Sequence, residues 1–465
     1  MRIYKGLIAV AVFLGIWLIP VPGGLTSQAW LLFAIFSATI AGLIVRPIPM
    51  GAVVLVGITV SALSGAVPSA AALKGFSNPT IWLIVIAFLF ARAFIVTGLG
   101  RRVAFLFISV FGKHTLGLAY SLVLSDLVIA PATPSNTARA GGILYPIVRS
   151  LATSFGSEPG ESSRKIGAYL VKNGYQCDLV TSAMFMTSMA ANPLAAELAS
   201  EVAGVELNWG MWALAGLLPG LISLAVIPLI LYKLYPPEIR STPEAPDWAR
   251  RMLGEMGRVS KEEKILTLVF LGILVSWATS QFHSVHPTVI ALGGVSTLLI
   301  FGVLKWGDVL GEKGAWDALI WFGGLVMMAG QLNDLGFIRW FAENVSGFVS
   351  GMSWLVALIV LLLVYFYSHY GLASMTAHVT AMYPVFLVAA VAAGAPPLLS
   401  ALGFAYFSNL NAGMTHYGSG PAPIYFGSGY VEFADWWKLG FIISVVNLII
   451  WIGIGFPYWK LLGLW

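Results

Sequence analysis

The stretch Ser135-Asn136-Thr137-Ala138-Arg139 lies deep in apolar sequence, and a related stretch, Ser374-Met375-Thr376-Ala377-His378, follows 239 positions later. The same offset relates Ile81-Trp82 to Ile320-Trp321, so the match is not one chance tripeptide. Each copy combines small hydroxyl residues with one basic side chain, which predicts two half-sites for one polar anion. Duplicated halves with a polar break in corresponding positions are typical of secondary transporters.

Composition places the chain in a membrane. Of its 465 residues, 58% are hydrophobic and only 10% are charged, whereas a soluble domain has about 25% charged residues. Apolar runs of about 17–25 residues fit helical spans rather than the short alternating strands of a β-barrel. We expect an all-α polytopic protein in the lipid bilayer. The net charge of +5 does not indicate a nucleic-acid partner, and the single Cys177 excludes an internal disulfide.

Two kinds of apolar segment are predicted. Eleven read as transmembrane helices, at about 6–22, 28–45, 51–67, 80–98, 166–186, 210–234, 264–281, 287–303, 315–333, 397–412 and 438–457. Two longer ones, about 115–152 and 354–394, carry the repeated motif at their centre. A re-entrant hairpin accounts for each, because non-helical backbone at membrane depth is tolerated only when it is buried in protein or lines a wet cavity.

Basic residues predict the orientation. Nineteen Lys and Arg lie in loops on the side of the N-terminus and three lie on the other side, which places the N-terminus in the cytoplasm. Eleven spans then put the C-terminus outside and make the repeat inverted. We expect an N-terminal half at 1–234, a polar cytoplasmic linker at 235–263 and a C-terminal half at 264–465.

The first hairpin tip has the chemistry of an anion site. Pro131 and Pro134 end the incoming helix, and Ser135-Asn136-Thr137 are preferred N-caps for the outgoing one. That helix presents free N–H groups and a partial positive charge, for which an anion is the matching ligand. The alternative is capping alone. The second tip, Ser374-Met375-Thr376, favours the ligand site.

Arg139 follows the first tip and His378 follows the second. An arginine at mid-bilayer costs at least about 3 kcal/mol, so it needs a partner or an aqueous cavity. One interpretation is a structural ion pair with Asp126 or Asp178. The favoured interpretation is a fixed positive charge that offsets a dianion.

Two spans are interrupted after the hairpins, at about 181–193 and 408–421. Pro193 is expected to break the first and Asn192 to cap a new half-helix, while glycines unwind the second. A packing kink is the ordinary explanation of such breaks. Since each break follows a hairpin, we favour a paired site. Its expected residues in the breaks are Asn192, Pro193, Thr415, His416 and Gly418, with Thr415 and His416 donating to a carboxylate.

Enzyme signatures are absent from the sequence. It has no His-Glu-x-x-His motif, no Gly-x-Ser-x-Gly elbow and no phosphate-binding Gly-Lys-Ser/Thr loop. We therefore expect no catalysis, no cofactor and no ATP coupling. His369, His378 and His416 come closest to a metal cluster, but few carboxylates accompany them and no metal is predicted. An intramembrane enzyme and an anion channel remain as remote alternatives.

At these residues the chain resembles the divalent anion/sodium symporter (DASS) family, nearly end to end. The motifs Pro-Ser-Asn-Thr-Ala-Arg-Ala-Gly-Gly (134–142), Met-Ala-Ala-Asn-Pro-Leu (189–194), Thr-Ala-His-Val-x-Ala-Met-Tyr (376–383) and Thr-His-Tyr-Gly-Ser-Gly-Pro-Ala-Pro (415–423) are similar to its exchanger branch. That branch includes citrate/succinate, tartrate/succinate and plastid 2-oxoglutarate/malate antiporters. The resemblance implies a homodimer and an elevator motion, and the expected location is the bacterial inner (plasma) membrane.

The resemblance also bears on coupling. Symporters of the family place a sodium ion near each tip, and Met375 removes a polar ligand from the second position. Arg139 and His378 are hypothesised to stand in for the two sodium charges. This predicts sodium-independent antiport of di- or tricarboxylates such as succinate, malate, 2-oxoglutarate, tartrate or citrate. A sodium-coupled dicarboxylate symporter of the same fold is the alternative.

Overall fold

The computed structural model describes residues 2–283, 285–345, 352–372 and 374–465, and these form helices with no β-strand. Eight of the described helical segments are long and apolar enough to cross a membrane, and three shorter helices are apolar as well. The expectation of an all-α polytopic fold is confirmed. Three of the eight, Thr115–Ala132, Trp354–Gly371 and Met375–Ala392, lie in the segments expected to form re-entrant hairpins. The number of eleven spans therefore stays a prediction.

The N-terminal part contains eleven helices within the described residues. These are α1 (Arg2–Trp17), α2 (Ser27–Val45), α3 (Met50–Leu63), α4 (Ser69–Ala72), α5 (Pro79–Thr97), α6 (Leu99–Phe111), α7 (Thr115–Ile129), α8 (Tyr145–Ser154), α9 (Gly167–Met184), α10 (Ala191–Ala203) and α11 (Trp209–Leu234). A π-helix, η3 (Thr137–Leu144), leads from the first tip into α8. The linker carries α12 (Ala245–Met256), which packs on α6.

The C-terminal part follows the same order. Its described helices are α13 (Lys261–Ala278), α14 (Pro287–Ile300), α15 (Trp306–Gly311), α16 (Lys313–Asp334), α17 (Phe337–Val345), α18 (Trp354–Ser368), α19 (Met375–Ala392), α20 (Pro397–Leu410), α21 (Ala422–Gly427), α22 (Phe433–Ile450) and α23 (Phe456–Leu461).

The sequence repeat is also a repeat of helices. The incoming hairpin arms α7 and α18 begin 239 positions apart, and so do the short 3₁₀ turns that end them, η2 (Ala130–Ala132) and η7 (His369–Gly371). The helices α2, α3 and α5 precede the first hairpin as α13, α14 and α16 precede the second. Helix α1 precedes the first copy, and the linker helix α12 stands at the corresponding position before the second, since residues 2–17 shift by 239 to 241–256.

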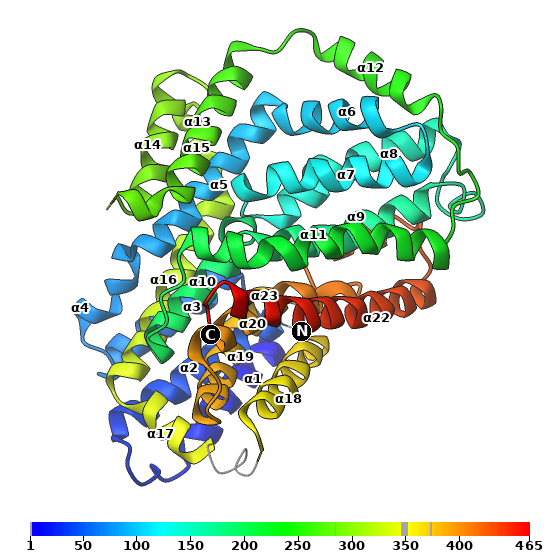
Figure 1. Ribbon diagram of the computed structural model, residues 1–465. Helices are drawn as coiled ribbons and strands as arrows, with labels where there is room; N and C mark the ends of the chain where they lie inside the picture. The colour runs from blue at the N-terminus through cyan, green and yellow to red at the C-terminus, as the bar shows by residue number, and fades with distance from the viewer. Residues whose placement is uncertain (1, 284, 346–351, 373) are drawn as a thin grey trace.

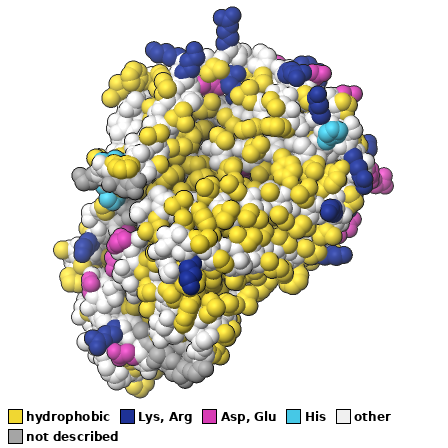
Figure 2. Space-filling model, in the orientation of Figure 1, with side chains coloured by type: hydrophobic (Ala, Val, Ile, Leu, Met, Phe, Trp, Pro, Cys, Tyr) yellow, Lys and Arg dark blue, Asp and Glu magenta, His cyan; other side chains and the backbone are white. Residues whose placement is uncertain are grey.

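Figure 1 shows two groups of helices. Helices α6, α7, α8, α9 and α11 lie nearly parallel as a stack, while α5, α13, α14 and α16 run steeply past one end of it. The face in Figure 2 is broadly hydrophobic, with most charged side chains at its edges. This distribution suits a molecule surrounded by lipid.

Helix α9 lies at the centre of the molecule. It packs against α7, α11 and α20, and all its residues except Gly174 are buried. A helix buried on every side is usually apolar all round, but α9 carries Asn173, Gln176, Asp178, Thr181 and Ser182. These buried polar groups need partners, and the hairpins and broken segments provide most of them.

Candidate functional site

The two hairpin tips meet. The side-chain amide nitrogen of Asn136 lies 3.7 Å from the sulfur of Met375. These residues occupy equivalent positions in the two copies of the repeat, 239 apart. If a twofold axis relates the two halves, equivalent residues meet where they lie on that axis. The contact therefore indicates that both halves contribute to one site.

A serine caps each tip, as expected for the first tip and as the structure shows for the second. Ser135 Oγ accepts from the backbone N–H of Ala138 at 3.1 Å, and Ser374 Oγ accepts from that of Ala377 at 3.3 Å. The first N–H groups of each helix have no partner within the helix, and side-chain capping satisfies only one of them. Thr137 and Thr376 are half-buried beside these groups. The tips thus offer hydroxyl and N–H donors from two sides, which is suitable for carboxylate oxygens.

Arg139 is fully buried and is bonded by all its nitrogens. Its Nε lies 2.7 Å from Asp126 Oδ1, and Nη2 lies 2.8 Å from Asp178 Oδ1. Its Nη1 donates to Thr133 O at 3.0 Å and to Ser188 O at 2.8 Å. The guanidinium therefore joins the incoming helix, the tip and the first break. The expected unpaired charge is not present, and the ion pair is what the structure shows.

This cluster places two carboxylates against one guanidinium. Thr181 donates to Asp126 Oδ2 at 2.5 Å, so both oxygens of that carboxylate are bonded. Asp178 Oδ2 is buried and has no hydrogen-bond partner among the described residues. Since Arg139 is already offset by two acids, it does not present a free positive charge to a substrate.

His378 makes the corresponding connection in the second half. Its Nε2 lies 3.0 Å from Ser368 Oγ, and Ser368 donates its own hydrogen to Tyr365 O at 2.8 Å. The ring must therefore donate to Ser368. Its Nδ1 faces the Asn411 amide nitrogen at 3.3 Å and accepts from it. These contacts suit a neutral imidazole, so the positive charge expected at His378 is also missing from this geometry.

The two connections are equivalent in position and differ in chemistry. Arg139 corresponds to His378 and Asp126 to Tyr365, each pair 239 apart. The Tyr365 and His378 rings pack at 4.3 Å between centroids. The first tip is thus attached by an ion cluster, and the second by neutral hydrogen bonds and ring packing.

Asn192 bridges the first break in a way that differs from the expectation. Its amide nitrogen donates to Ser182 O at 2.8 Å and Phe185 O at 2.9 Å, which are carbonyls at the end of α9. Ala190, not Asn192, holds the N-cap position of α10, and Pro193 lies in the first turn, where a missing N–H is harmless. The chain breaks before both residues. Asn192 Oδ1 also accepts from Asn409 of the other half at 2.8 Å.

The second break brings two of its three predicted residues together, since a Cβ at Gly418 would collide with the Thr415 hydroxyl, and His416 lies apart from them. Gly418 O accepts from His369 Nε2 at 2.7 Å, and Thr415 Oγ1 is buried without a hydrogen-bond partner in the described part of the chain. His416 instead packs among aromatic rings, 4.9 Å from Phe426 and 5.4 Å from Phe433 between centroids. The expected role of His416 as a carboxylate donor has no support in these contacts.

Sequence reasoning missed the contacts that hold the halves together. Tyr175 donates to Ala412 O at 2.7 Å and Gln176 to Gly413 O at 2.6 Å, which satisfies carbonyls freed by the second break. A side chain at Gly420 would collide with the Thr137 hydroxyl, so the first tip packs directly on the second break. The only signal in the sequence was the polar content of an otherwise apolar helix.

Comparison with known proteins gives the family. A family model described as "Sodium:sulfate symporter transmembrane region" matches residues 1–465. The chain belongs to this family. It is 55% identical to "Putative malate transporter YflS" of Bacillus subtilis, over 99% of this chain and 96% of that protein. It is 48% identical to "Dicarboxylate transporter 1, chloroplastic" of Spinacia oleracea, over 97% and 80% respectively.

Solved structures support the fold alone. The YdaH transporter of Alcanivorax borkumensis superposes with a TM-score of 0.57 at 12% identity, covering 83% of this chain and 87% of that one. MtrF of Neisseria gonorrhoeae gives 0.56 at 14% identity, covering 85% and 83%. The predicted membership of the DASS family is confirmed, and the protein is a membrane transporter rather than an enzyme.

Proposed function

We propose that this protein exchanges dicarboxylates across the membrane without sodium. The observation that carries the proposal is the meeting of two serine-capped helix starts, one from each half, at Asn136 and Met375. A substrate with two carboxylates matches a site with two such starts. The relatives named as malate and dicarboxylate transporters support the same substrate class.

Recognition follows from the donors at the tips. One carboxylate would bind the free N–H groups and hydroxyls of Ser135-Asn136-Thr137, and the other those of Ser374-Met375-Thr376. Succinate, malate, 2-oxoglutarate and tartrate have the two charged ends that this arrangement requires. Citrate supplies a third carboxylate.

Sodium independence is proposed from the contacts of Arg139 and His378. A cation held between a tip and a break needs carbonyl and carboxylate oxygens as ligands. The Arg139 guanidinium already occupies such oxygens at Thr133, Ser188 and the two aspartates. His378 makes a neutral attachment at the second tip. Both side chains would take over the structural role of sodium, which is to hold each tip against its neighbouring helices. Neither would present a free positive charge to the substrate.

Movement is proposed to follow the family, as an elevator in each protomer of a homodimer. The moving part would comprise the hairpins with α9, α10 and α20, in an inverted repeat whose N-terminus is cytoplasmic. An empty site would carry unsatisfied N–H groups through a dry environment, which is costly. A bound dicarboxylate would satisfy them, so each crossing would require cargo.

Labelled malate uptake into proteoliposomes tests the proposal. Vesicles are loaded with unlabelled malate or left empty, in sodium-free and sodium buffers. We expect uptake only into loaded vesicles and no effect of sodium. Uptake into empty vesicles that requires a sodium gradient would establish the symporter instead, and current without saturation or counter-substrate would indicate a channel.

A further inference from the structure

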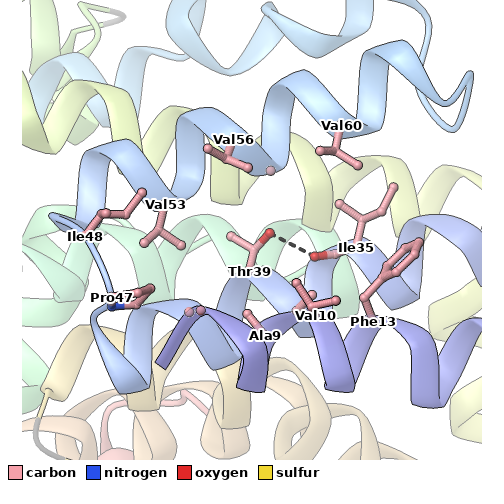
Figure 3. A pocket seen from close by; sticks show the side chains of 14 residues that line it. Ala9, Val10, Phe13, Ile35, Thr39, Pro47, Ile48, Val53, Val56 and Val60 are labelled. Carbon is pink, nitrogen blue, oxygen red and sulfur yellow. Dashed lines mark hydrogen bonds between the residues drawn. The ribbon is translucent and has the colours of Figure 1, made fainter. Parts of the chain in front are cut away.

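An apolar groove of about 320 Å³ lies between α1, α2 and α3, away from the hairpin tips. Figure 3 shows side chains of all three helices pointing into it. Its wall includes Val10 and Phe13 of α1 and Val56 and Val60 of α3. Val10 and Val56 are 51% and 54% exposed, so the groove opens on the surface that would face lipid.

The wall offers no hydrogen-bond donor to an occupant. Among the described residues of the wall, Thr39 is the one hydroxyl residue, and this hydroxyl donates to Ile35 O at 2.8 Å within α2. A polar ligand would lose its hydrogen bonds to water and gain none here. The groove therefore suits a hydrocarbon chain.

One end of the groove is cationic. Helices α1 and α2 are consecutive and antiparallel, with Trp30 Nε1 donating to Ile16 O at 3.0 Å where they join. The start of α1 and the end of α2 consequently lie together at the other end. Lys5 precedes Gly6, and Arg46 precedes Pro47, and both Gly6 and Pro47 line the groove.

Arg46 is held in an unusual conformation at this end. Its φ of 49° is the one positive value among the non-glycine residues that the structure describes. The position is the C-cap of α2, where glycine or asparagine would be unstrained. Arg46 is exposed, and neither it nor Lys5 forms an ion pair with a described residue.

The ends of α1 indicate how it sits in a bilayer. Tyr4 and Lys5 mark one end and Trp17 the other, about 20 Å apart along the helix. Aromatic and basic residues favour the headgroup level. The part of the groove near Gly6 and Ala9 would thus lie just below the headgroups of the leaflet on the N-terminal side.

We propose that the groove binds an anionic phospholipid, with one acyl chain along α1 and α3 and its phosphate against Lys5 and Arg46. The cytoplasmic leaflet, where the N-terminus is placed, is rich in anionic lipid. Charge complementarity at one end and a dry wall beyond it together select this occupant. The inference does not depend on the transported substrate.

Glycines of α1 supply a matched pair of variants. A Cβ at Gly6 meets nothing within 4 Å, and Gly6 lines the groove, so Gly6→Phe would place a ring in the acyl position. A Cβ at Gly15 is equally unobstructed, but Gly15 lies outside the groove. Gly15→Phe therefore controls for bulk on the same helix. Lys5→Gln with Arg46→Gln removes the charge without filling the groove.

The measurement is native mass spectrometry of the delipidated protein with added phosphatidylglycerol or phosphatidylcholine. We expect one tightly retained phosphatidylglycerol per chain in the unchanged protein and in Gly15→Phe. Retention should be lost in Gly6→Phe and fall about fivefold for each basic residue removed. Equal retention of both lipids, or full retention in Gly6→Phe, would overturn the proposal. Conversion of a dimer to monomers by Gly6→Phe alone would show that a second copy fills the groove.

Discussion

At the scale of the residue, Arg139 and His378 occupy equivalent positions but should respond differently to substitution. Arg139→Gln leaves two buried carboxylates without their counter-charge, and breaking a buried ion pair typically costs 3–5 kcal/mol. His378→Gln removes neutral hydrogen bonds of about 1 kcal/mol each. We expect Arg139→Gln to lower the Tm in detergent much more than His378→Gln.

A triple variant separates charge balance from transport. Neutralising Asp126 and Asp178 to asparagine together with Arg139→Gln should recover much of the lost Tm, because no buried charge is left unpaired. It should not recover malate exchange if the Arg139 guanidinium is needed to hold the first tip against α7 and α9. Equal Tm losses for Arg139→Gln and His378→Gln would contradict the difference in charge between the two attachments.

The sequence predicted the contacts of some site residues and not those of others. It predicted a cap among Ser135, Asn136 and Thr137, because capping depends on the local chain, and the structure shows Ser135 in that role. For Arg139 it offered an ion pair with Asp126 or Asp178 but favoured a positive charge for a dianion, and the structure shows both pairs, which form where α7 and α9 pack together. The rarity of acids in apolar sequence identified the two carboxylates, but no local pattern decided between an ion pair and a charge kept for the substrate.

At the scale of the element, the start of each tip helix should control affinity. Ser135→Ala or Ser374→Ala removes an N-cap, which costs about 1 kcal/mol. It also disorders N–H groups proposed to hold a carboxylate, so we expect the half-saturating malate concentration to rise severalfold. Asn208→Ala is the control, because Asn208 caps α11 by accepting from Met211 N at 2.8 Å. If the half-saturating malate concentration rises equally in Asn208→Ala, the tips are not the site that recognises malate.

The attachment of the linker offers a second test among elements. Arg102 of α6 binds both carboxylate oxygens of Glu263, at 2.6 and 3.1 Å, and the pair is buried at the start of α13. Glu263→Gln should destabilise the protein by about 3 kcal/mol or more. Asp247→Asn breaks the exposed pair with Arg250 and should change stability by less than about 1 kcal/mol. Thermal unfolding of both variants compares the buried pair with the exposed one. Equal changes in Tm would argue against a larger contribution from the buried pair.

Helix positions were largely predictable and helix breaks were not. The bounds predicted for the two hairpins, 115–152 and 354–394, enclose α7 to α8 and α18 to α19, because a repeat places both from one motif, and their re-entrance stays a prediction. Pro193 and Asn192 were expected at the break itself, but both lie inside α10. Proline is tolerated in a first helical turn, so its presence marks a helix start as well as a helix end.

At the scale of the whole molecule, both halves should be needed for one site, and a bond between the tips tests this. With the buried Cys177 replaced by alanine, cysteines at positions 136 and 375 would lie where the Asn136 nitrogen and Met375 sulfur are 3.7 Å apart. We expect mild oxidation to link them and to stop malate exchange, reductant to restore it, and bound malate to slow the linkage. Each single-cysteine variant should exchange malate at the same rate with oxidant as with reductant, whatever its rate relative to the unchanged protein. If the pair links and exchange continues, the meeting of the tips is structural, and the dicarboxylate crosses elsewhere. If neither oxidation nor a short bifunctional thiol reagent joins the pair, the two tips do not share one site, and the twofold argument for a substrate with two carboxylates fails with it.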